Sequence, residues 1–178
     1  MKYVALLRGI NVGGNRKVPM AELKTAFEQC GFSDVRTYIN SGNVIFESLK
    51  KPNVSAMQNT LLSTFGFEIP LLILDGDRIC RIAEAIPEGW QNDTTQKSDI
   101  AYLFPAADDA TITMKLGCNA DIETAVYVEG ALLYSVERKN QHRSSLLRVV
   151  GTPLYQQMTI RNLNTARKLA ELCYARSQ

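Results

Sequence analysis

The first part of the chain alternates short apolar segments with helix-period segments in a fixed order. Residues 2–7 (KYVALL) form an almost continuous apolar run, which indicates an interior strand. Residues 20–30 place apolar side chains on one helix face between Pro19 and Gly31. Residues 35–46 read as two short strands around the turn sequence NSGN. A second helix (52–65), followed by Gly66, and a further strand (67–74) complete the order βαββαβ.

This order is the ferredoxin-like pattern, which we expect over residues 1–75. The second half is less regular. The elements expected there are a helix at 77–86, a strand at 99–104, a weak helix at 107–116 and two strands around the Glu129–Gly130 turn. Two helices follow, one at 144–157 that Gly151 and Pro153 interrupt, and one at 163–175. The predicted fold class is therefore α+β, with an N-terminal ferredoxin-like subdomain (1–75) packed against a second, smaller α+β subdomain (76–178).

A basic, glycine-rich loop follows the first strand. Residues 8–17 (RGINVGGNRK) contain three glycines, three basic side chains and no acid. In a ferredoxin-like sheet this loop and the turn at 40–43 lie at the same edge. Backbone N–H groups exposed by glycine, with a helix N-terminus behind them, favour an anion. The loop is not a Walker motif: Gly9 and Gly14 have the right spacing, but Asn15 and Arg16 stand where lysine and a hydroxyl residue belong. A purely structural role, with glycines supplying positive φ angles, stays open.

Charge is strongly segregated along the chain although the net charge is only +2. Residues 1–21 carry four basic groups and no acid. Residues 22–137 carry a net −9, and residues 138–170 carry seven basic groups without a carboxylate. We expect the two acid-free segments to meet in space and to attract an anion there.

The second acid-free segment supplies further candidates. Arg161 stands near the start of the last helix, where a guanidinium and the helix end together suit a phosphate or carboxylate. An internal carboxylate such as Glu47 or Asp99 is its alternative partner. Asn162 or Asn164 is well placed as the N-cap of that helix. His142, the single histidine, is either an exposed polar group or a ligand contact.

The residues predicted to line a ligand cleft between the two halves share polarity and position within these segments. They are Arg8, Asn11, Gly13, Gly14, Arg16, Lys17, Ser41, Asn43, His142, Arg143, Thr159, Arg161 and Asn162.

Several kinds of site are absent from the sequence. No HExxH, GxSxG or metal-ligand cluster occurs, so we expect no metal and no cofactor. The acid pairs Asp75/Asp77 and Asp108/Asp109 stand at predicted helix starts, where capping explains them. Four scattered cysteines without a CxxC pair are typical of a reduced, cytoplasmic protein, and no apolar run is long enough to span a bilayer.

Three stretches, LLRGINVGGNRKVPMAELKTAF, VRTYINSGNVIF and MTIRNLNTARKL, resemble the Domain of Unknown Function 1697 family of mostly bacterial proteins. The resemblance implies an α+β protein of two subdomains, with no agreed activity. The family's signature positions match at Arg8, Gly9, Asn11, Gly13, Gly14, Ser41, Gly42, Asn43, Thr159, Arg161, Asn162, Asn164 and Thr165. Leu163 departs from the pattern, because the family usually has tryptophan there.

Three function classes follow from these features. The first is binding of a small phosphorylated or otherwise anionic ligand, with or without catalysis. The second is a nucleic-acid-binding module that uses the same basic edge, although few aromatic residues near it are available for base stacking. The third is a protein-interaction module in which the glycine loop is structural. The oligomeric state does not follow from the sequence.

Overall fold

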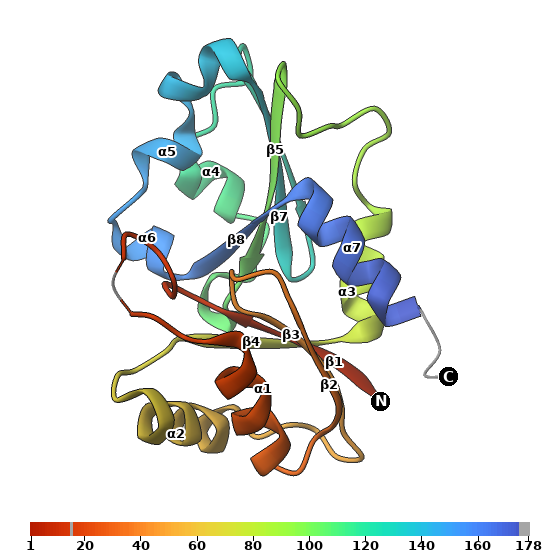
Figure 1. The fold of residues 1–178 in the computed structure, drawn as a ribbon. Coiled ribbons are helices and arrows are strands. Elements are labelled where there is room, and N and C mark those ends of the chain that lie inside the picture. Colours follow the sequence, from red (N-terminus) through yellow and green to blue (C-terminus); the bar gives the residue numbers. More distant parts are fainter. Residues whose placement is uncertain (15, 175–178) are drawn as a thin grey trace. The chain divides into compact units, whose positions relative to one another are not determined.

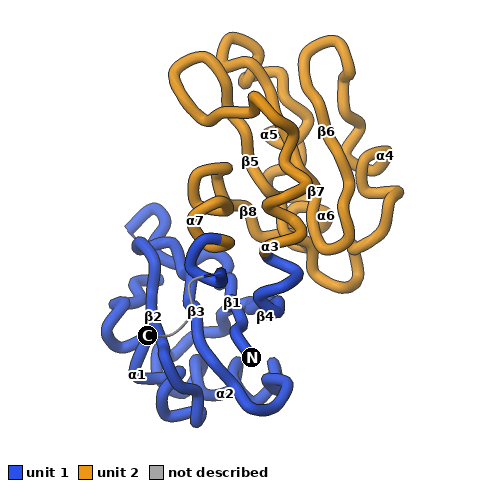
Figure 2. The backbone as a smooth tube through the Cα atoms, turned by 90° about the vertical axis from the view of Figure 1, so that its right-hand side faces the viewer, with its two compact units in different colours: residues 1–79, 171–178 blue, residues 80–170 orange. Residues whose placement is uncertain are grey.

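The computed structural model describes residues 1–14 and 16–174. These residues form two four-stranded antiparallel sheets and seven α-helices (Figure 1). The chain divides into two compact units, which Figure 2 colours separately: unit 1 is Met1–Ile79 with Glu171–Gln178, and unit 2 is Cys80–Ala170. The predicted division into subdomains of residues 1–75 and 76–178 stays a prediction.

Unit 1 contains the six elements in the predicted order. They are β1 (Lys2–Leu7), α1 (Met20–Gln29), β2 (Ser33–Tyr38), β3 (Asn43–Glu47), α2 (Val54–Phe65) and β4 (Leu71–Asp75). The strands lie in the order β2-β3-β1-β4, and every neighbouring pair is antiparallel. Leu6 pairs with Asn43, so the end of β1 lies beside the beginning of β3. This register brings the loop after β1 to the turn before β3.

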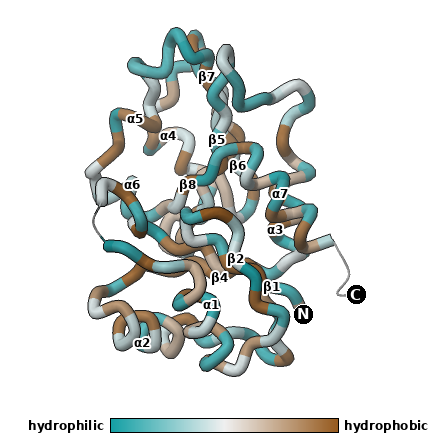
Figure 3. Tube along the Cα trace, viewed as in Figure 1, coloured by the Kyte–Doolittle hydropathy of each residue, from teal (hydrophilic) through white to brown (hydrophobic). Residues whose placement is uncertain are grey.

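The core of unit 1 follows from the alternation of side chains along β1. Tyr3, Ala5 and Leu7 point to the face that packs against α1 and α2, with Phe27 and Leu61 among their buried neighbours. In Figure 3 the hydrophobic colour covers parts of the strands, and the hydrophilic colour covers much of several connecting loops. This packing fixes the sheet that carries the loop.

Unit 2 holds the second sheet, in the order β6-β7-β5-β8. Two helices, α3 (Gly76–Glu84) and α7 (Leu163–Tyr174), each begin in one unit and end in the other. The other elements are β5 (Gln96–Leu103), the 3₁₀ helix η1 (Pro105–Ala107), α4 (Ile112–Leu116), β6 (Glu123–Val128), β7 (Ala131–Glu137), the 3₁₀ helix η2 (Arg138–Arg143), α5 (Ser145–Arg148), α6 (Pro153–Gln156) and β8 (Met158–Asn162).

The segment before the last helix differs from the sequence prediction. The helix expected at 144–157 with an interruption at Gly151 and Pro153 is two one-turn helices, α5 and α6, since Gly151 has φ +85° and Pro153 begins a new helix. Strand β8 was not predicted. The strand has only five residues and begins two residues after the one-turn helix α6, so its apolar–polar alternation is too short to identify a strand. β8 pairs with β5 and carries three of the candidate site residues.

Asp75 caps a helix start as predicted. Its carboxylate accepts a hydrogen bond from the Arg78 N–H at 2.8 Å, in the first turn of α3. The Asp109 carboxylate accepts one from the Thr111 N–H at 2.7 Å. Thr111 is itself the N-cap of α4, so Asp109 closes a turn before that helix and does not cap it.

Asp108 has another role, so its predicted capping function is wrong. Its Oδ1 accepts hydrogen bonds from the Tyr127 hydroxyl at 3.0 Å and from the Gly130 N–H at 2.7 Å. The carboxylate thereby ties η1 to the β6–β7 turn. The partner of Asp108 lies about 20 residues further along the chain, beyond the reach of a local capping rule.

Candidate functional site

Asn11 joins the glycine loop to the hairpin turn of unit 1. Its Nδ2 donates hydrogen bonds to the carbonyls of Val18 and Asn40, both at 3.0 Å. Its Oδ1 accepts a hydrogen bond from the Val18 N–H at 2.8 Å. The predicted meeting of loop and turn at one edge of the sheet is confirmed. Asn11 has φ +54°, a left-handed conformation that asparagine tolerates better than most residues.

Gly42 brings the turn into close contact with β1. The Leu7 N–H donates to the Gly42 carbonyl at 2.8 Å. A Cβ on Gly42 would lie 2.7 Å from Leu7 Cβ and 2.8 Å from Ile10 Cδ1. Asn43 is fully buried, and its Nδ2 donates to the Tyr38 carbonyl at 3.1 Å and to Ser41 Oγ at 2.9 Å. The polar groups of the turn therefore shape the edge of the sheet.

The tip of the loop is open. Gly13 and Gly14 are exposed, with φ +63° and +78°, and a Cβ on either would meet nothing within 4 Å. Val12 is 71% exposed, and Lys17 is also exposed. The part of the loop that Asn11 does not hold is thus free to receive a ligand from solvent.

The two arginines of the loop differ in their surroundings. Arg16 is exposed but held, because its Nη2 donates to the Glu68 carbonyl at 2.6 Å and its guanidinium lies 5.0 Å from the centroid of the Phe67 ring. Such a contact orients the cation without neutralising it. Arg8 is half-buried, and its N–H donates to the Pro70 carbonyl at 3.0 Å. The two side chains leave the same loop, whose ends are tied together through Asn11.

In unit 2, Arg161 is a buried residue of β8. It is 7% exposed, and its Nη1 donates to Thr159 Oγ1 at 2.9 Å and to the Ile160 carbonyl at 2.8 Å. Burial lowers the pKa of the Arg161 guanidinium to about 10, and the nearby Tyr102 counteracts this shift. Thr159 therefore orients Arg161 along its own strand.

Asp99, one of the two carboxylates considered as a partner of Arg161, faces away from it. Arg161 pairs with Ile100 on β5, whereas Asp99 pairs with Asn162. Adjacent residues of a strand point to opposite faces, so Asp99 and Arg161 lie on opposite sides of the sheet. Asp99 forms its ion pair with Lys97.

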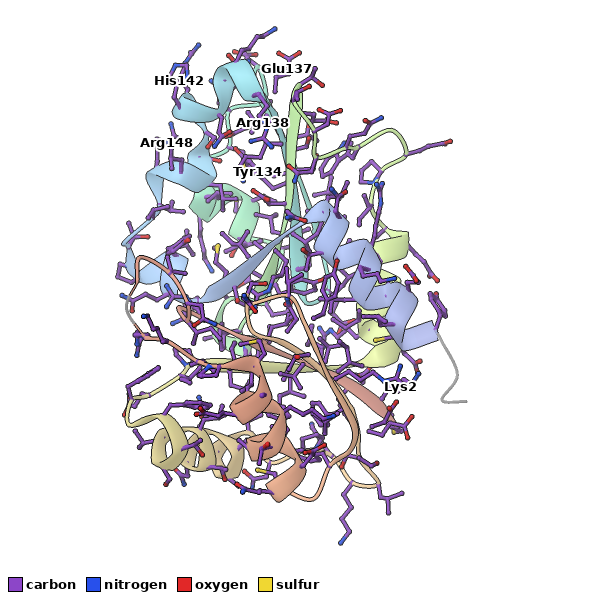
Figure 4. All side chains as sticks on the ribbon, viewed as in Figure 1. Lys2, Tyr134, Glu137, Arg138, His142 and Arg148 are labelled. Atoms are coloured by element: carbon purple, nitrogen blue, oxygen red, sulfur yellow. The ribbon has the colours of Figure 1, made fainter. Side chains whose placement is uncertain are left out.

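The remaining candidates of unit 2 do not form one cluster. Asn162 is the N-cap of α7, as predicted, because its Oδ1 accepts from the Thr165 N–H at 2.8 Å. His142 and Arg143 are exposed in η2, and Figure 4 shows His142 near the end of the sheet with Arg138. η2 follows the end of β7 that pairs with Gln96. Four residues along β5 separate that point from the partner of Arg161, roughly 13 Å of strand.

The structure thus assembles the candidates of unit 1 at one edge of its sheet and divides those of unit 2 between η2 and β8. The predicted convergence of the two acid-free segments involves both units and stays a prediction. Leu163, which replaces the family's tryptophan, is the first residue of α7 and is fully buried.

A polar cluster in unit 2 was missed by the sequence analysis. Glu123 is buried, and its carboxylate accepts hydrogen bonds from the Asn119 N–H at 2.8 Å, the Ser145 N–H at 2.9 Å and the Tyr134 hydroxyl. Burial alone would raise the pKa of Glu123, but these donors lower it overall. Burial and the bond to Glu123 raise the pKa of Tyr134.

A cavity of about 210 Å³ lies beside this cluster, also within unit 2. Lys97 and Asp99 of β5 supply its charged groups, and α5 and α6 contribute to its walls. Its lining residues come from six separate elements, so no local sequence motif predicts the cavity. In the sequence, the cavity is marked only by two charged residues, Lys97 and Asp99, spaced two apart. Exposed strands commonly show the same spacing, so it does not predict a cavity.

Two further properties concern only the described ranges 1–14 and 16–174. No helix there has the length and apolar character needed to cross a bilayer. Within the same ranges no group of three His, Cys, Asp or Glu side chains is arranged to hold a metal ion.

Comparisons with known proteins give a family and a fold. Residues 1–134 match the model of a family described as protein of unknown function (DUF1697). A solved structure, described as that of the conserved bacterial protein SP0830 from Streptococcus pneumoniae, is similar with a TM-score of 0.81 and 25% sequence identity. The similarity covers 97% of this chain and 98% of that protein. The search of curated proteins found no match.

Proposed function

The chain belongs to the DUF1697 family, and we propose that unit 1 binds a small phosphorylated or otherwise anionic ligand at the tip of its glycine loop. A nucleotide or a sugar phosphate is the class of ligand we have in mind. Arg8, Arg16 and Lys17 supply the positive charge in this proposal, and the backbone around Gly13 and Gly14 supplies the N–H donors.

One observation carries the proposal: the loop is fixed at its base and open at its tip. Asn11 ties the base to Val18 and Asn40 through three hydrogen bonds. Gly13 and Gly14 are consecutive left-handed residues with open space around both. Backbone N–H groups in such turns form concave anion sites, and a pre-formed loop loses little entropy on binding.

The charge around the loop supports an anion. Residues 1–21 contain four basic groups and no carboxylate. Arg16 is anchored to the Glu68 carbonyl, which keeps its guanidinium near the loop, with Nη1 3.6 Å from the Cβ position of Gly9. A phosphate at the tip would be attracted by fixed cations and by backbone dipoles together.

Two finer assignments belong to the same proposal. The element order and the strand order of unit 1 favour the ferredoxin-like arrangement. The free thiols Cys30, Cys80, Cys118 and Cys173 favour a cytoplasmic location, where thiols remain reduced.

The test is a thermal-shift comparison of salts and ligands on the full chain. At equal ionic strength, phosphate and sulfate should raise the melting temperature more than chloride does, because binding to the native state stabilises it by mass action. Nucleotides and sugar phosphates should act at lower concentrations than inorganic phosphate. An identical response to phosphate, sulfate and chloride would contradict the proposal.

A pair of matched variants locates the site. Lys17→Ala should diminish the phosphate-dependent shift. Lys51→Ala removes the same charge from an exposed position near the opposite end of β3 and should leave the shift unchanged. Short DNA or RNA is included in the same panel. A response to oligonucleotides without any response to nucleotides or phosphate would favour the nucleic-acid alternative.

A further inference from the structure

We propose that the cavity of unit 2 is a second ligand site, which takes a small uncharged molecule bearing a carboxamide or lactam edge on an apolar body. This site is separate from the glycine loop, and it does not depend on the function proposed for unit 1. The ion pair of Lys97 and Asp99 would recognise the polar edge, and side chains of β7, β8, α5 and α6 would hold the apolar body.

The polar end of the cavity is the ion pair of Lys97 and Asp99, which leaves one carboxylate oxygen of Asp99 available to a ligand. Asp99 is 3% exposed, and the one side-chain partner it has among the described residues is Lys97, which bonds to Oδ2. Lys97 keeps 30% of its side chain exposed. Both residues line the cavity. A buried carboxylate is stable only when its oxygens are well hydrogen-bonded, so Asp99 Oδ1 is an acceptor that a ligand can complete.

The charge balance of this pair selects the head group of the ligand. One ammonium and one carboxylate lie side by side, so their charges cancel. A charged head would add an uncompensated charge in a half-closed cavity, which is costly. A carboxamide or lactam instead presents an N–H donor to Asp99 and a C=O acceptor to Lys97, next to each other and without net charge.

The remainder of the cavity is apolar and small. Val136, Leu146, Leu147, Val150, Tyr155 and Ile160 line it, together with Tyr134, Gln141 and Ser144. Figure 4 shows Tyr134 on the side of the sheet that α5 covers, where the bond to Glu123 fixes its ring. An apolar cavity of about 150 Å³ accommodates benzene, so 210 Å³ accommodates a six-membered ring with a short polar substituent.

The cavity has fixed walls. The Glu123 carboxylate accepts from the Ser145 N–H and from the Tyr134 hydroxyl, which joins α5 to β7 across the unit. Ser144 caps α5 through a bond from the Leu147 N–H to its Oγ at 3.3 Å. A pre-formed pocket of this kind binds small molecules without first paying an ordering cost.

The test uses three ring compounds of one size on the full chain: benzamide, benzoate and benzylammonium. Binding is followed by chemical-shift changes of backbone amides in two-dimensional NMR spectra. Benzamide should shift amides around Asp99, Tyr134 and Ser144 in a saturable way and should leave the amides of residues 8–17 unmoved. Benzoate and benzylammonium should bind at least about tenfold more weakly.

Two variants and a control complete the design. Asp99→Asn should weaken benzamide binding about tenfold or more, because a hydrogen bond to a charged acceptor is lost. Leu147→Phe starts from a half-exposed side chain, so the fold tolerates it while the ring enters the cavity and blocks benzamide. Asp121→Asn, an exposed acid of the same unit, should leave binding unchanged.

Three outcomes would overturn the proposal. The first is the absence of any saturable shift with benzamide in the wild-type protein. The second is tighter binding of either charged compound. The third is unchanged benzamide affinity in both Asp99→Asn and Leu147→Phe. Because all three readouts lie in unit 2, their failure would leave the anion site of unit 1 untouched.

Discussion

At the scale of single residues, side-chain amides and carboxylates hold segments that are distant in the sequence. Asn11 bonds to the main chain of Val18 and Asn40, and Glu123 gathers the main chain of Asn119 and Ser145. Each of these side chains makes several hydrogen bonds to the main chain, so a single substitution removes several hydrogen bonds at once. Both therefore give direct tests of the structure.

Replacing Asn11 by alanine should lower the free energy of unfolding by about 2 kcal/mol, because three hydrogen bonds disappear and alanine disfavours a positive φ. Asn40→Ala is the matched control, since Asn40 contributes its carbonyl and not its side chain. Urea denaturation of both variants measures the difference. Equal stabilities would show that the Asn11 clamp is absent in solution.

Replacing Glu123 by glutamine should reduce the free energy of unfolding at neutral pH by about 1–3 kcal/mol, because charged hydrogen bonds to Tyr134 and Ser145 are weakened. The folded-state pKa of Glu123 lies below its ordinary value of 4.5. Its stabilisation is therefore fully present above pH 4.5 and is lost as the pH falls through the lowered pKa.

The pH profile separates this effect from a general loss of packing. As the pH falls below 4.5, the wild type should lose more stability than Glu123→Gln, since glutamine does not titrate. Glu88→Gln, at an exposed position of unit 2, serves as the control and should keep the wild-type profile. Parallel profiles for all three proteins would contradict the assignment.

At the scale of elements, the β1 loop and the β2–β3 turn form one edge because two backbones approach closely. Gly42 allows that approach, whereas Gly13 stands in open space although both have positive φ. Gly42 is therefore required for close packing as well as for its backbone conformation, whereas Gly13 is required for its backbone conformation alone.

Gly42→Ala should cost about 2–4 kcal/mol, because its Cβ would lie 2.7 Å from Leu7 Cβ in addition to the left-handed strain. Gly13→Ala should cost about 1–2 kcal/mol, the strain alone. Equilibrium denaturation of the two variants gives the comparison. If Gly13→Ala were the more destabilised of the two, the close packing of the turn against β1 would be refuted.

The sequence predicts the elements of unit 1 well and those of unit 2 less well. Proline, glycine and apolar spacing mark α1 and α2 locally, and NSGN marks the hairpin. β8 escapes prediction because it has only five residues and one-turn helices precede it. The clamp of Asn11 and the cavity around Asp99 depend on long-range register, which spacing along one segment does not contain.

At the scale of the whole molecule, basic and acidic residues are segregated along the chain. The first acid-free segment lies in unit 1, and residues 138–170 of the second lie in unit 2, while residues 22–137 carry a net −9. The charge pattern of the sequence predicts that the two segments attract one anion together. Double-mutant analysis tests this prediction without assuming a geometry.

Lys17→Gln and Arg143→Gln should each reduce the phosphate-dependent stabilisation, and the double variant should reduce it by less than the two effects added. A coupling of at least about 0.5 kcal/mol is expected for residues that share a ligand. Full additivity would mean that the two segments bind anions independently, and it would leave the loop site itself intact.

The central claim is that the tip of the glycine loop receives an anion. The most direct measurement is a phosphate titration of the ¹⁵N-labelled full chain, followed by two-dimensional NMR at constant ionic strength. The amides of Gly13, Gly14 and Lys17 should shift progressively and saturate with phosphate, and chloride should not reproduce the shift. Amides of that loop that stay unmoved, or that respond equally to phosphate and chloride, would contradict the account.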